Sequence, residues 1–484
     1  MKRRAPRLAI AALALLFAAA CATNPVTGRR ELSLVSSGQE LQLGREGYAA
    51  AIAEYGRYDD AALAAYVDSV GQRVARASHL PDLGWHFTLL DDPAVNAFAM
   101  PGGYIYITRG ILASLNSEAQ LAGVLGHEIG HVTHRHTAES MTQQSLMGLG
   151  LGALEVASPT LRRYDGAAQQ ALGLMFLSYS RAHETEADQL GVEYATRAGY
   201  DPREIPATYA MLKRVSQAAG STIPPFLSTH PDPGDREVRT AELARAAAAG
   251  KMGLLIRQRD YLQHLEGLVY GRDPRQGYFE GAHYFHPTLG FEMEIPEGWK
   301  TQDSRAAMQA AEPSQKAGFQ LSVARTGGTP TPAAFVQALV ADGKIQHADG
   351  GSERPGGYDA WIGRLAVAGQ NGPTILDAGF IRISRGTMLQ LIGQSAIPGD
   401  DFDHRIMASL RSIRPLYDQA RRDPLPSRVH LTDAPRAGAF ADVIAGLGPL
   451  GISADELAII NNVESGESIQ GGKRIKLVRP SRTR

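Results

Sequence analysis

Residues 125–136, LGHEIGHVTHRH, contain four histidines and one carboxylate in a stretch of helical character. His127, Glu128 and His131 form an H-E-x-x-H motif, which is typical of zinc hydrolases. Residues four apart share a face of a helix, so His127 and His131 can reach one metal ion. Glu128 lies about 100° around the helix and can reach a water beside that ion. Zinc lowers the pKa of such a water, and Glu128 can take its proton as general base.

The same helical geometry separates the other two histidines from the predicted ion. His134 lies nearly on the face of His127 but about 10 Å further along the axis. It is therefore expected at the edge of the site at most. His136 points about 180° from His127 in a continuous helix, so we expect it on the opposite side. This stretch is thus predicted to supply two metal ligands.

A third ligand must come from another segment. A metzincin-type site needs a third histidine ten residues after His127, and the chain has Thr137 there. That class is excluded. The remaining solution is a carboxylate from a second helix.

The segment SRAHETEAD (180–188) offers that carboxylate. Glu184 and Asp188 are four residues apart and share a helical face. We predict Glu184 as the third ligand and Asp188 as the residue that holds a ligand histidine from behind. Glu186 is the alternative ligand, but it lies on roughly the opposite side of the helix from Glu184. His183 is expected to flank the site.

The alternative to a metal site is a helix with two histidines satisfied by hydrogen bonds. Gly126 and Gly130, which flank the motif, bear on this choice. Each costs about 1 kcal/mol in a helix interior relative to alanine. We therefore expect close packing, or the approach of a substrate, to require them.

The elements that must position these residues are mainly helices. Apolar periodicity predicts helices at residues 39–55, 59–78, 117–140, 166–198, 203–217, 234–249 and 257–268. Residues 85–91 and 103–108, which are rich in β-branched and aromatic side chains, are predicted strands. Residues 39–265 therefore form a mainly helical α+β domain with a small sheet.

Further domains follow this one. Residues 22–38 are predicted to be a tether, and the turn-rich break at 271–277 ends the first domain. The strand-like alternation of residues 279–415 predicts a separate α+β accessory domain, to which the sequence assigns no chemistry. The Pro-containing linker RRDPLPS (421–427) leads to a small module at 428–480.

That last module is similar to a degenerate LysM repeat. Residues 454–478, ADELAIINNVESGESIQGGKRIKLV, combine a helix, an asparagine turn, a glycine turn and a short strand. LysM modules bind cell-wall glycan, so the resemblance implies peptidoglycan as a partner. The alternative is that its basic tail is simply solvated.

Residues 1–20 are read as a signal peptide rather than as part of the fold. A basic start precedes an apolar run at 8–20, which is too short to span a bilayer comfortably. Cys21, the only cysteine, follows FAAA as in a bacterial lipobox, so we expect its acylation. The alternative is an ordinary signal peptide with a chance cysteine. Ala22 in place of aspartate favours the outer membrane, which predicts a lipid-anchored periplasmic protein.

Composition narrows the classes of function. The formal net charge of the 484 residues is -1, and no basic aromatic-rich patch is present, so nucleic-acid binding is not expected. With one cysteine the chain has no internal disulfide, and a zinc ion must be held by histidines and carboxylates.

Four motifs in order carry a family resemblance: NAFAMPGGYIYITRGIL, HEIGHVTHRH, SRAHETEAD and STHPDPGDR. Together they resemble the HtpX- and BepA-like zinc metalloendopeptidases, the family that also contains the CAAX prenyl endopeptidases. CATNPVTGRRELSLVS looks like the start of its bacterial lipoprotein branch. The resemblance covers about residues 22–265. It implies a glutamate-type zincin (gluzincin) fold with one zinc on His127, His131 and Glu184 and with Glu128 as the base.

The first of these motifs predicts a substrate-binding strand. Its glycines let a peptide backbone approach closely, and an edge strand at 103–108 could pair with an extended peptide. The predicted substrate-binding residues are Asn96, Pro101, Gly102, Gly103 and Tyr104. The alternative is a plain turn that enters a structural strand.

STHPDPGDREVR (228–239) adds His230 and Arg236 to the predicted site. We hypothesise that one of them approaches the zinc. There it could stabilise the oxyanion or occupy the open metal position in a resting state. The alternative for His230 is a surface histidine on a Pro-rich loop.

These expectations converge on a zinc-dependent endopeptidase of the cell envelope that cleaves exposed or misfolded envelope proteins. The competing hypothesis is a non-catalytic envelope assembly factor or a peptidoglycan-associated scaffold lipoprotein. The complete set of His127, Glu128, His131 and Glu184 favours catalysis.

Overall fold

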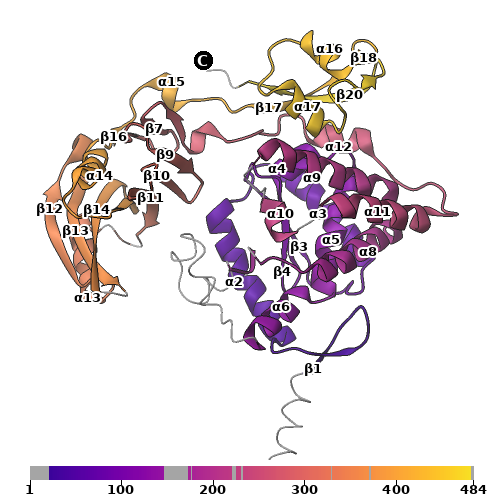
Figure 1. Ribbon diagram of the computed structural model, residues 1–484, viewed down its shortest axis with the longest axis horizontal. Helices are drawn as coiled ribbons and strands as arrows, with labels where there is room; N and C mark the ends of the chain where they lie inside the picture. Colours follow the sequence, from indigo (N-terminus) through magenta and orange to yellow (C-terminus); the bar gives the residue numbers. More distant parts are fainter. Residues whose placement is uncertain are drawn as a thin grey trace, which may run out of the picture. The chain divides into compact units, whose positions relative to one another are not determined.

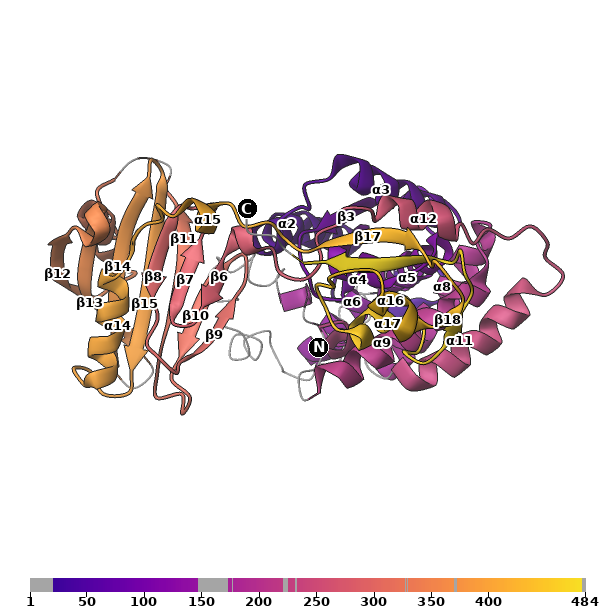
Figure 2. The ribbon, with the colours of Figure 1, turned by 90° about the horizontal axis from the view of Figure 1, so that it is seen from above.

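The computed structural model describes most of the chain (Figures 1 and 2). The described residues are 21–146, 173–175, 177–220, 225–230, 233–326, 328, 330–369 and 372–480. They fall into two compact units, residues 21–271 with 427–480, and residues 272–426. The predicted signal peptide at 1–20 lies outside the described residues.

Helices dominate the first unit, as predicted. They are α2 (Ser37–Tyr55), α3 (Ala61–Arg76), α4 (Arg109–Ser114), α5 (Glu118–Thr133), α6 (His136–Leu146), α8 (Arg181–Arg197), α9 (Ile205–Ala219), α10 (Pro225–Thr229), α11 (Pro233–Ala248) and α12 (Gln258–His264). Short α4 and α10 were not predicted. Of the predicted helix at 166–198, residues 173–175 and Arg181–Arg197 are helical and 177–180 are not, while 166–172 and 176 lie outside the described residues.

The sheet of this unit contains β3 (His86–Leu90), β4 (Ala97–Met100) and β5 (Tyr104–Thr108). β5 lies in the middle, parallel to β3 on one side and antiparallel to β4 on the other. The expectation that the strand at 103–108 is an edge strand is therefore wrong, because both of its hydrogen-bonding edges are occupied. A substrate strand could add to β4, which the sequence analysis did not assign as a strand.

A small hairpin precedes the helices. β1 (Cys21–Thr23) pairs with β2 (Arg30–Leu32), within the segment predicted to be a tether. Asn24 in its turn is buried and donates from Nδ2 to His134 Nδ1 at 3.1 Å. This hairpin is thus packed against the first unit.

α5 begins where the sequence predicts and ends earlier. The Ser117 side chain accepts a hydrogen bond from the backbone N–H of Gln120, as an N-cap does. The predicted continuous helix at 117–140 is interrupted at Arg135, whose φ of 63° is left-handed, and α6 starts at the next residue. Such a conformation costs a non-glycine residue about 1–2 kcal/mol.

Contacts from distant segments hold this conformation of Arg135. Its guanidinium contacts Glu40 Oε2 through Nε at 3.0 Å and through a terminal nitrogen at 2.8 Å. It also donates to the Val35 carbonyl at 2.9 Å. The interruption of the helix is therefore decided by the N-terminal segment, which lies about 100 residues away in the sequence.

The C-terminal segment 427–480 contains two antiparallel pairs of strands and two helices. β17 (Arg428–Asp433) pairs with β20 (Arg474–Arg479), and α16 (Phe440–Ala445) and α17 (Ala454–Ile460) lie between them in the sequence, together with the short strands β18 (Gly438–Ala439) and β19 (Ser468–Ile469). This segment belongs to the same compact unit as the helical domain, whereas the linker predicted a separate module (Figure 2).

Lys476 in β20 explains this attachment. Its side chain is fully buried, and Nζ donates to the carbonyls of Ala113 and Leu115, each at 2.7 Å. Asn116 Nδ2 donates in turn to the carbonyl of Ile460 at 3.0 Å. Lys476 thus satisfies backbone carbonyls at the end of α4, and Asn116 satisfies one at the end of α17.

The second unit is an α+β domain, as the alternation of 279–415 predicts. Its larger sheet has the strand order β12 (His347–Glu353), β13 (Asp359–Gly369), β14 (Gly372–Ser384), β15 (Thr387–Ser395), β11 (Ala317–Arg325), β10 (Ala307–Ala311) and β9 (Lys300–Asp303). A smaller sheet has the order β16 (Arg414–Pro415), β8 (Phe291–Glu294), β7 (His283–His286) and β6 (Tyr278–Glu280). The helices are α13 (Pro332–Ala341), α14 (Asp401–Arg411) and α15 (Gln419–Arg422).

No helix of the described residues combines sufficient length with sufficient apolar character to cross a bilayer.

Replacing Lys476 with methionine tests the attachment of the C-terminal segment. The variant leaves two buried carbonyls without a donor, at a cost of about 1–3 kcal/mol for each unsatisfied group. We expect a lower midpoint of thermal unfolding, measured by calorimetry on the full chain. Lys473→Met, on the preceding turn, is the matched control. An unchanged midpoint for Lys476→Met would contradict the role of this lysine.

Candidate metal centre

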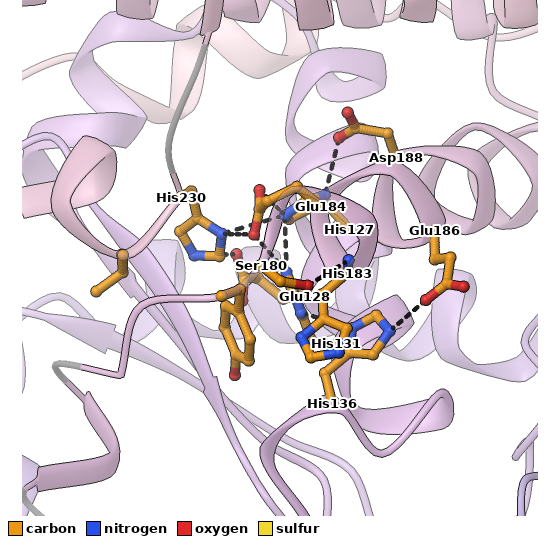
Figure 3. A network of polar contacts seen from close by, with 12 residues as sticks. His127, Glu128, His131, His136, Ser180, His183, Glu184, Glu186, Asp188 and His230 are labelled. Carbon is orange, nitrogen blue, oxygen red and sulfur yellow. Dashed lines mark hydrogen bonds and ion pairs between the residues drawn. The ribbon is translucent and has the colours of Figure 1, made fainter. Parts of the chain in front are cut away.

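The buried residues of the H-E-x-x-H motif meet side chains from two other segments (Figure 3). α5 supplies His127 and His131, α8 supplies Glu184, and His230 follows directly after α10. One ligand atom from each of the four residues lies within 4.8 Å of the others, and all four residues are buried. The arrangement is a group that could hold a metal ion.

The atoms that face one another are those expected of metal ligands. His127 Nε2 lies 3.0 Å from His131 Nε2, and Glu184 Oε1 lies 3.4 Å from His131 Nε2. The Nδ1 atom of His230 lies 2.9 Å from Glu184 Oε1 and 3.4 Å from His127 Nε2. The carboxylate predicted from a second helix is thus beside both motif histidines, and His230 approaches the same point.

Glycines allow α5 and α8 to approach closely enough for this arrangement. A Cβ at Gly126 would lie 3.0 Å from the carbonyl oxygen of Gly191, and one at Gly191 would lie 3.0 Å from the backbone nitrogen of His127. A Cβ at Gly130 would lie 3.2 Å from the Cα of Ala187. Close helix packing therefore accounts for both motif glycines.

Asp188 contacts His127 on the side away from the ligand group. Its Oδ1 lies 3.1 Å from His127 Nδ1, which is the contact that the spacing from Glu184 predicts. Tyr209 donates to the same oxygen at 2.6 Å, and Arg239 donates to Oδ2 at 2.9 Å. Burial raises the pKa of Asp188, but the charge of Arg236 and the contact with His127 hold it below its ordinary value.

Arg236 is buried beside both carboxylates of α8. Its NH1 atom lies 2.7 Å from Glu184 Oε2, and its NH2 atom lies 2.7 Å from Asp188 Oδ1. The guanidinium also lies over the ring of Tyr209, 4.6 Å from the centroid. Arg236 is near the site as predicted, although its donors are directed at this protein's own carboxylates. Tyr209 was not predicted, because its helical apolar surroundings resemble those of any core tyrosine.

The protonation states of His131 and Glu184 suit metal binding, which requires neutral histidine and ionised carboxylate. Burial lowers the pKa of His131 well below its ordinary value, so the ring is neutral at pH 7. Burial acts to raise the pKa of Glu184, but the neighbouring His230 and Arg236 hold it well below the ordinary range. Glu184 is therefore ionised.

Glu128 differs from the other carboxylates of the site. It is fully buried, and neither carboxylate oxygen has a hydrogen-bond partner among the described residues. His230 Nε2 approaches Oε1 at 3.7 Å. Burial raises the pKa of Glu128, and the nearby His230 and His127 act in the opposite direction. An unsatisfied buried carboxylate is costly to maintain, which indicates a functional position.

His136 does not lie where a continuous helix would place it. Because the chain turns at Arg135, His136 Nδ1 lies 2.9 Å from His131 Nδ1, and the expectation that it points away from the site is wrong. Its Nε2 lies 3.1 Å from Glu186 Oε2, and its ring stacks on His183 with centroids 4.4 Å apart. Glu186 and His183, which were not favoured as ligands, are thus neighbours of His136.

The predicted substrate-binding residues at 96–104 lie around β4 and β5. Asn96 is buried, and its Oδ1 has no hydrogen-bond partner among the described residues. Gly102 and Gly103 have φ of 81° and 91°. A Cβ at Gly102 would lie 3.1 Å from the Cα of Leu41 in α2, so packing within the protein already requires glycine there.

Pro101 and Tyr104, which flank these glycines, also pack within the protein. Pro101 is buried, and Tyr104 stacks on His86 with centroids 4.5 Å apart. Binding of substrate by this turn stays a prediction.

Residues 61–243, which include all four residues of the ligand group, match the model of Peptidase family M48. The chain is 31% identical over 242 residues to the beta-barrel assembly-enhancing protease of Escherichia coli, covering 47% of this chain and 48% of the relative. It is 32% identical over 212 residues to the mitochondrial metalloendopeptidase OMA1 of Schizosaccharomyces pombe, covering 43% and 61%.

A plant protein is similar to this chain over a comparable stretch. The mitochondrial metalloendopeptidase OMA1 of Arabidopsis thaliana is 32% identical over 189 residues, covering 37% of this chain and 38% of the relative. The chain thus spans about half the length of the bacterial relative and of some others that it matches. Among solved structures, PsbP of Synechocystis covers 28% of this chain and 94% of its own at a TM-score of 0.22 and 12% identity, which supports no inference.

Gly126→Ala tests whether the contact between α5 and α8 positions the ligand group. The added Cβ pushes against the backbone of Gly191, so we expect weaker metal binding and a lower midpoint of thermal unfolding. Metal affinity is measured by competition with a chelator. Gly38→Ala in α2, where the nearest atom to an added Cβ is 4.0 Å away, is the control. Metal affinity equal to that of the parent chain would contradict this role.

Proposed function

We propose that this protein is a zinc-dependent metalloendopeptidase. The observation that carries the proposal is the convergence of His127, His131 and Glu184 beside the unsatisfied carboxylate of Glu128. The match of residues 61–243 to Peptidase family M48 and the names of the relatives support a peptidase.

Zinc is the metal that suits the group best. Histidine nitrogens and a carboxylate are its usual ligands, with bonds of about 2.0–2.2 Å in a tetrahedron. Bonds of that length place ligand atoms roughly 3.3 Å apart. The facing atoms of the four residues, with Oε1 for Glu184, are separated by 2.9, 3.0, 3.4 and 3.4 Å. These separations support a single tetrahedral ion.

The residues then divide the chemistry of peptide hydrolysis. A bound zinc ion supplies a water of lowered pKa and polarises the scissile carbonyl. Glu128 takes the proton of the attacking water as general base and later donates it to the leaving amine nitrogen. Its carboxylate is suited to this because no protein hydrogen bond among the described residues competes for it. Asp188 orients the ring of His127.

His230 is proposed to occupy the fourth ligand position in a resting state. Its Nδ1 is as close to Glu184 and His127 as the other ligand atoms are to one another. A substrate must then displace it, after which its ring could stabilise the oxyanion. Arg236 is proposed to hold Glu184 and Asp188 in place, since its donors already face these carboxylates.

An extended substrate is proposed to pair with β4. In the sheet of the described residues β4 lies at an edge, and it contacts α5, which carries the motif. Main-chain hydrogen bonds to an edge strand bind a peptide with little dependence on its sequence. This mode of binding suits a peptidase that acts on exposed or misfolded segments.

The proposed setting is the periplasm of a bacterial envelope. Acylation of Cys21 would attach the protein to a membrane, which we propose to be the outer membrane, and substrates would be envelope proteins. The 428–480 segment, in which two helices lie between the paired strands β17 and β20, is proposed to be a LysM-like module that contacts peptidoglycan. The alternative function is a non-catalytic assembly factor or a peptidoglycan-associated scaffold. The name beta-barrel assembly-enhancing protease joins assembly and proteolysis in one relative.

Glu128→Gln decides between the enzyme and the scaffold. We expect the full chain to bind one zinc per molecule and to cleave unfolded casein, and the variant to keep its zinc while cleavage falls at least 100-fold. Metal analysis and a gel assay measure the two quantities. Glu139→Gln in α6 is the control. Zinc binding without cleavage that depends on Glu128 would favour the scaffold.

His230→Ala tests the resting state. We expect the variant to bind zinc more weakly, because one ligand is lost, and to cleave casein several-fold faster at saturating zinc. Exposed His430→Ala is the control. Unchanged zinc affinity with slower cleavage would instead support the oxyanion role. Unchanged values of both would remove His230 from the mechanism.

A further inference from the structure

The two motif histidines have different partners on the nitrogen that faces away from the ligand group. His127 Nδ1 faces a carboxylate, Asp188, at 3.1 Å. His131 Nδ1 faces another imidazole, His136 Nδ1, at 2.9 Å. Metal-bound histidines usually donate this N–H to a carboxylate, a carbonyl or a water. The partner of His131 therefore requires an explanation.

Proton positions follow from the geometry, on the basis of the proposed metal site. If His131 binds the ion through Nε2, its proton is on Nδ1 and is donated to His136 Nδ1. His136 then carries its own proton on Nε2, which lies 3.1 Å from Glu186 Oε2. In this series each N–H donor faces an acceptor atom. Figure 3 shows His131, His136 and Glu186 together beside the ligand group.

We propose that His136 and Glu186 are positioning residues that fix the tautomer and ring orientation of His131. His136 is completely buried and stacks on His183, so its ring is held in place. Its position depends on the left-handed backbone at Arg135, which Glu40 and the Val35 carbonyl stabilise. The strained residue thus has a functional consequence, because it turns His136 toward His131.

A second metal site is the competing interpretation of this cluster. His134, His136 and Glu186 also bring ligand atoms within 4.8 Å of one another. The tautomers argue against it. Asn24 Oδ1 accepts from the backbone N–H groups of Val26 and Thr27, so its Nδ2 must be the group that donates to His134 Nδ1.

His134 therefore carries its proton on Nε2, as His136 does. Both protons are directed toward Glu186 Oε2, at 3.8 Å from His134 and 3.1 Å from His136. The nitrogens that would bind a cation are thus the protonated ones. The cluster is arranged to supply donors to Glu186 rather than to hold a metal.

Variants at His136 separate positioning from packing. His136→Asn keeps an acceptor oxygen near the place of Nδ1, whereas His136→Phe keeps a ring to stack on His183 and loses the acceptor. We expect the zinc dissociation constant of the full chain to rise 10- to 100-fold in His136→Phe and to stay within about threefold in His136→Asn. The visible spectrum of the cobalt-loaded chain should change in the phenylalanine variant and be retained in the asparagine variant.

Two surface variants test the contact between Glu186 and His136 without altering the core. Glu186, whose side chain is 42% exposed, is replaced by leucine, which should raise the zinc dissociation constant several-fold. Glu139, at 40%, contacts His183 but not His136, so Glu139→Leu is the matched control and should bind zinc like the parent. These variants remain informative if His136→Phe fails to fold.

The outcomes distinguish this inference from the proposed function. A parent chain that binds no zinc overturns both. If the parent binds one zinc and His136→Phe matches it in zinc affinity and cobalt spectrum, the positioning role alone is overturned. Where His136→Phe does not fold, the same result for Glu186→Leu overturns it. Equal weakening in His136→Asn and His136→Phe assigns His136 to packing and also overturns it. A second zinc that is lost in Glu186→Leu supports the second metal site instead.

Discussion

The contact between α5 and α8 is the constraint on which the site depends. Gly126 and Gly191 leave no room for a side chain between the two backbones. Because the helices approach so closely, His127, His131 and Glu184 reach one point although Glu184 is more than fifty residues further along the chain. Helix propensity opposes glycine at such positions, so the site is formed at the expense of local helix stability.

The close approach also buries charge, and the surrounding residues compensate for it. Glu184 and Asp188 are ionised in the interior, and Arg236 contacts both of them. Tyr209 and Arg239 satisfy the remaining acceptors of Asp188. Buried charges that are paired and hydrogen-bonded are tolerated, whereas isolated ones are not. In contrast, neither oxygen of Glu128 has a hydrogen-bond partner among the described residues, and His230 Nε2 lies 3.7 Å from Oε1, which leaves the carboxylate free to exchange a proton.

Several features of the fold were predictable because they are local. The helices around 39–55, 59–78, 203–217 and 234–249 follow from apolar periodicity and are found within a few residues of their expected ends. Non-local features were not predictable. The middle position of β5 depends on which strands pair with it, and the attachment of the C-terminal segment depends on the burial of Lys476 against α4.

For the site, the sequence by itself determined the parts that depend on helical spacing. His127 and His131 share a face, as do Glu184 and Asp188, because an interval of four residues is nearly one helical turn. The tertiary structure decided what lies beside them. Arg135, held by contacts with Glu40 and Val35, ends α5 and turns His136 toward His131. Periodicity assumes an unbroken helix, and the distant residues that break it leave no signal within the motif.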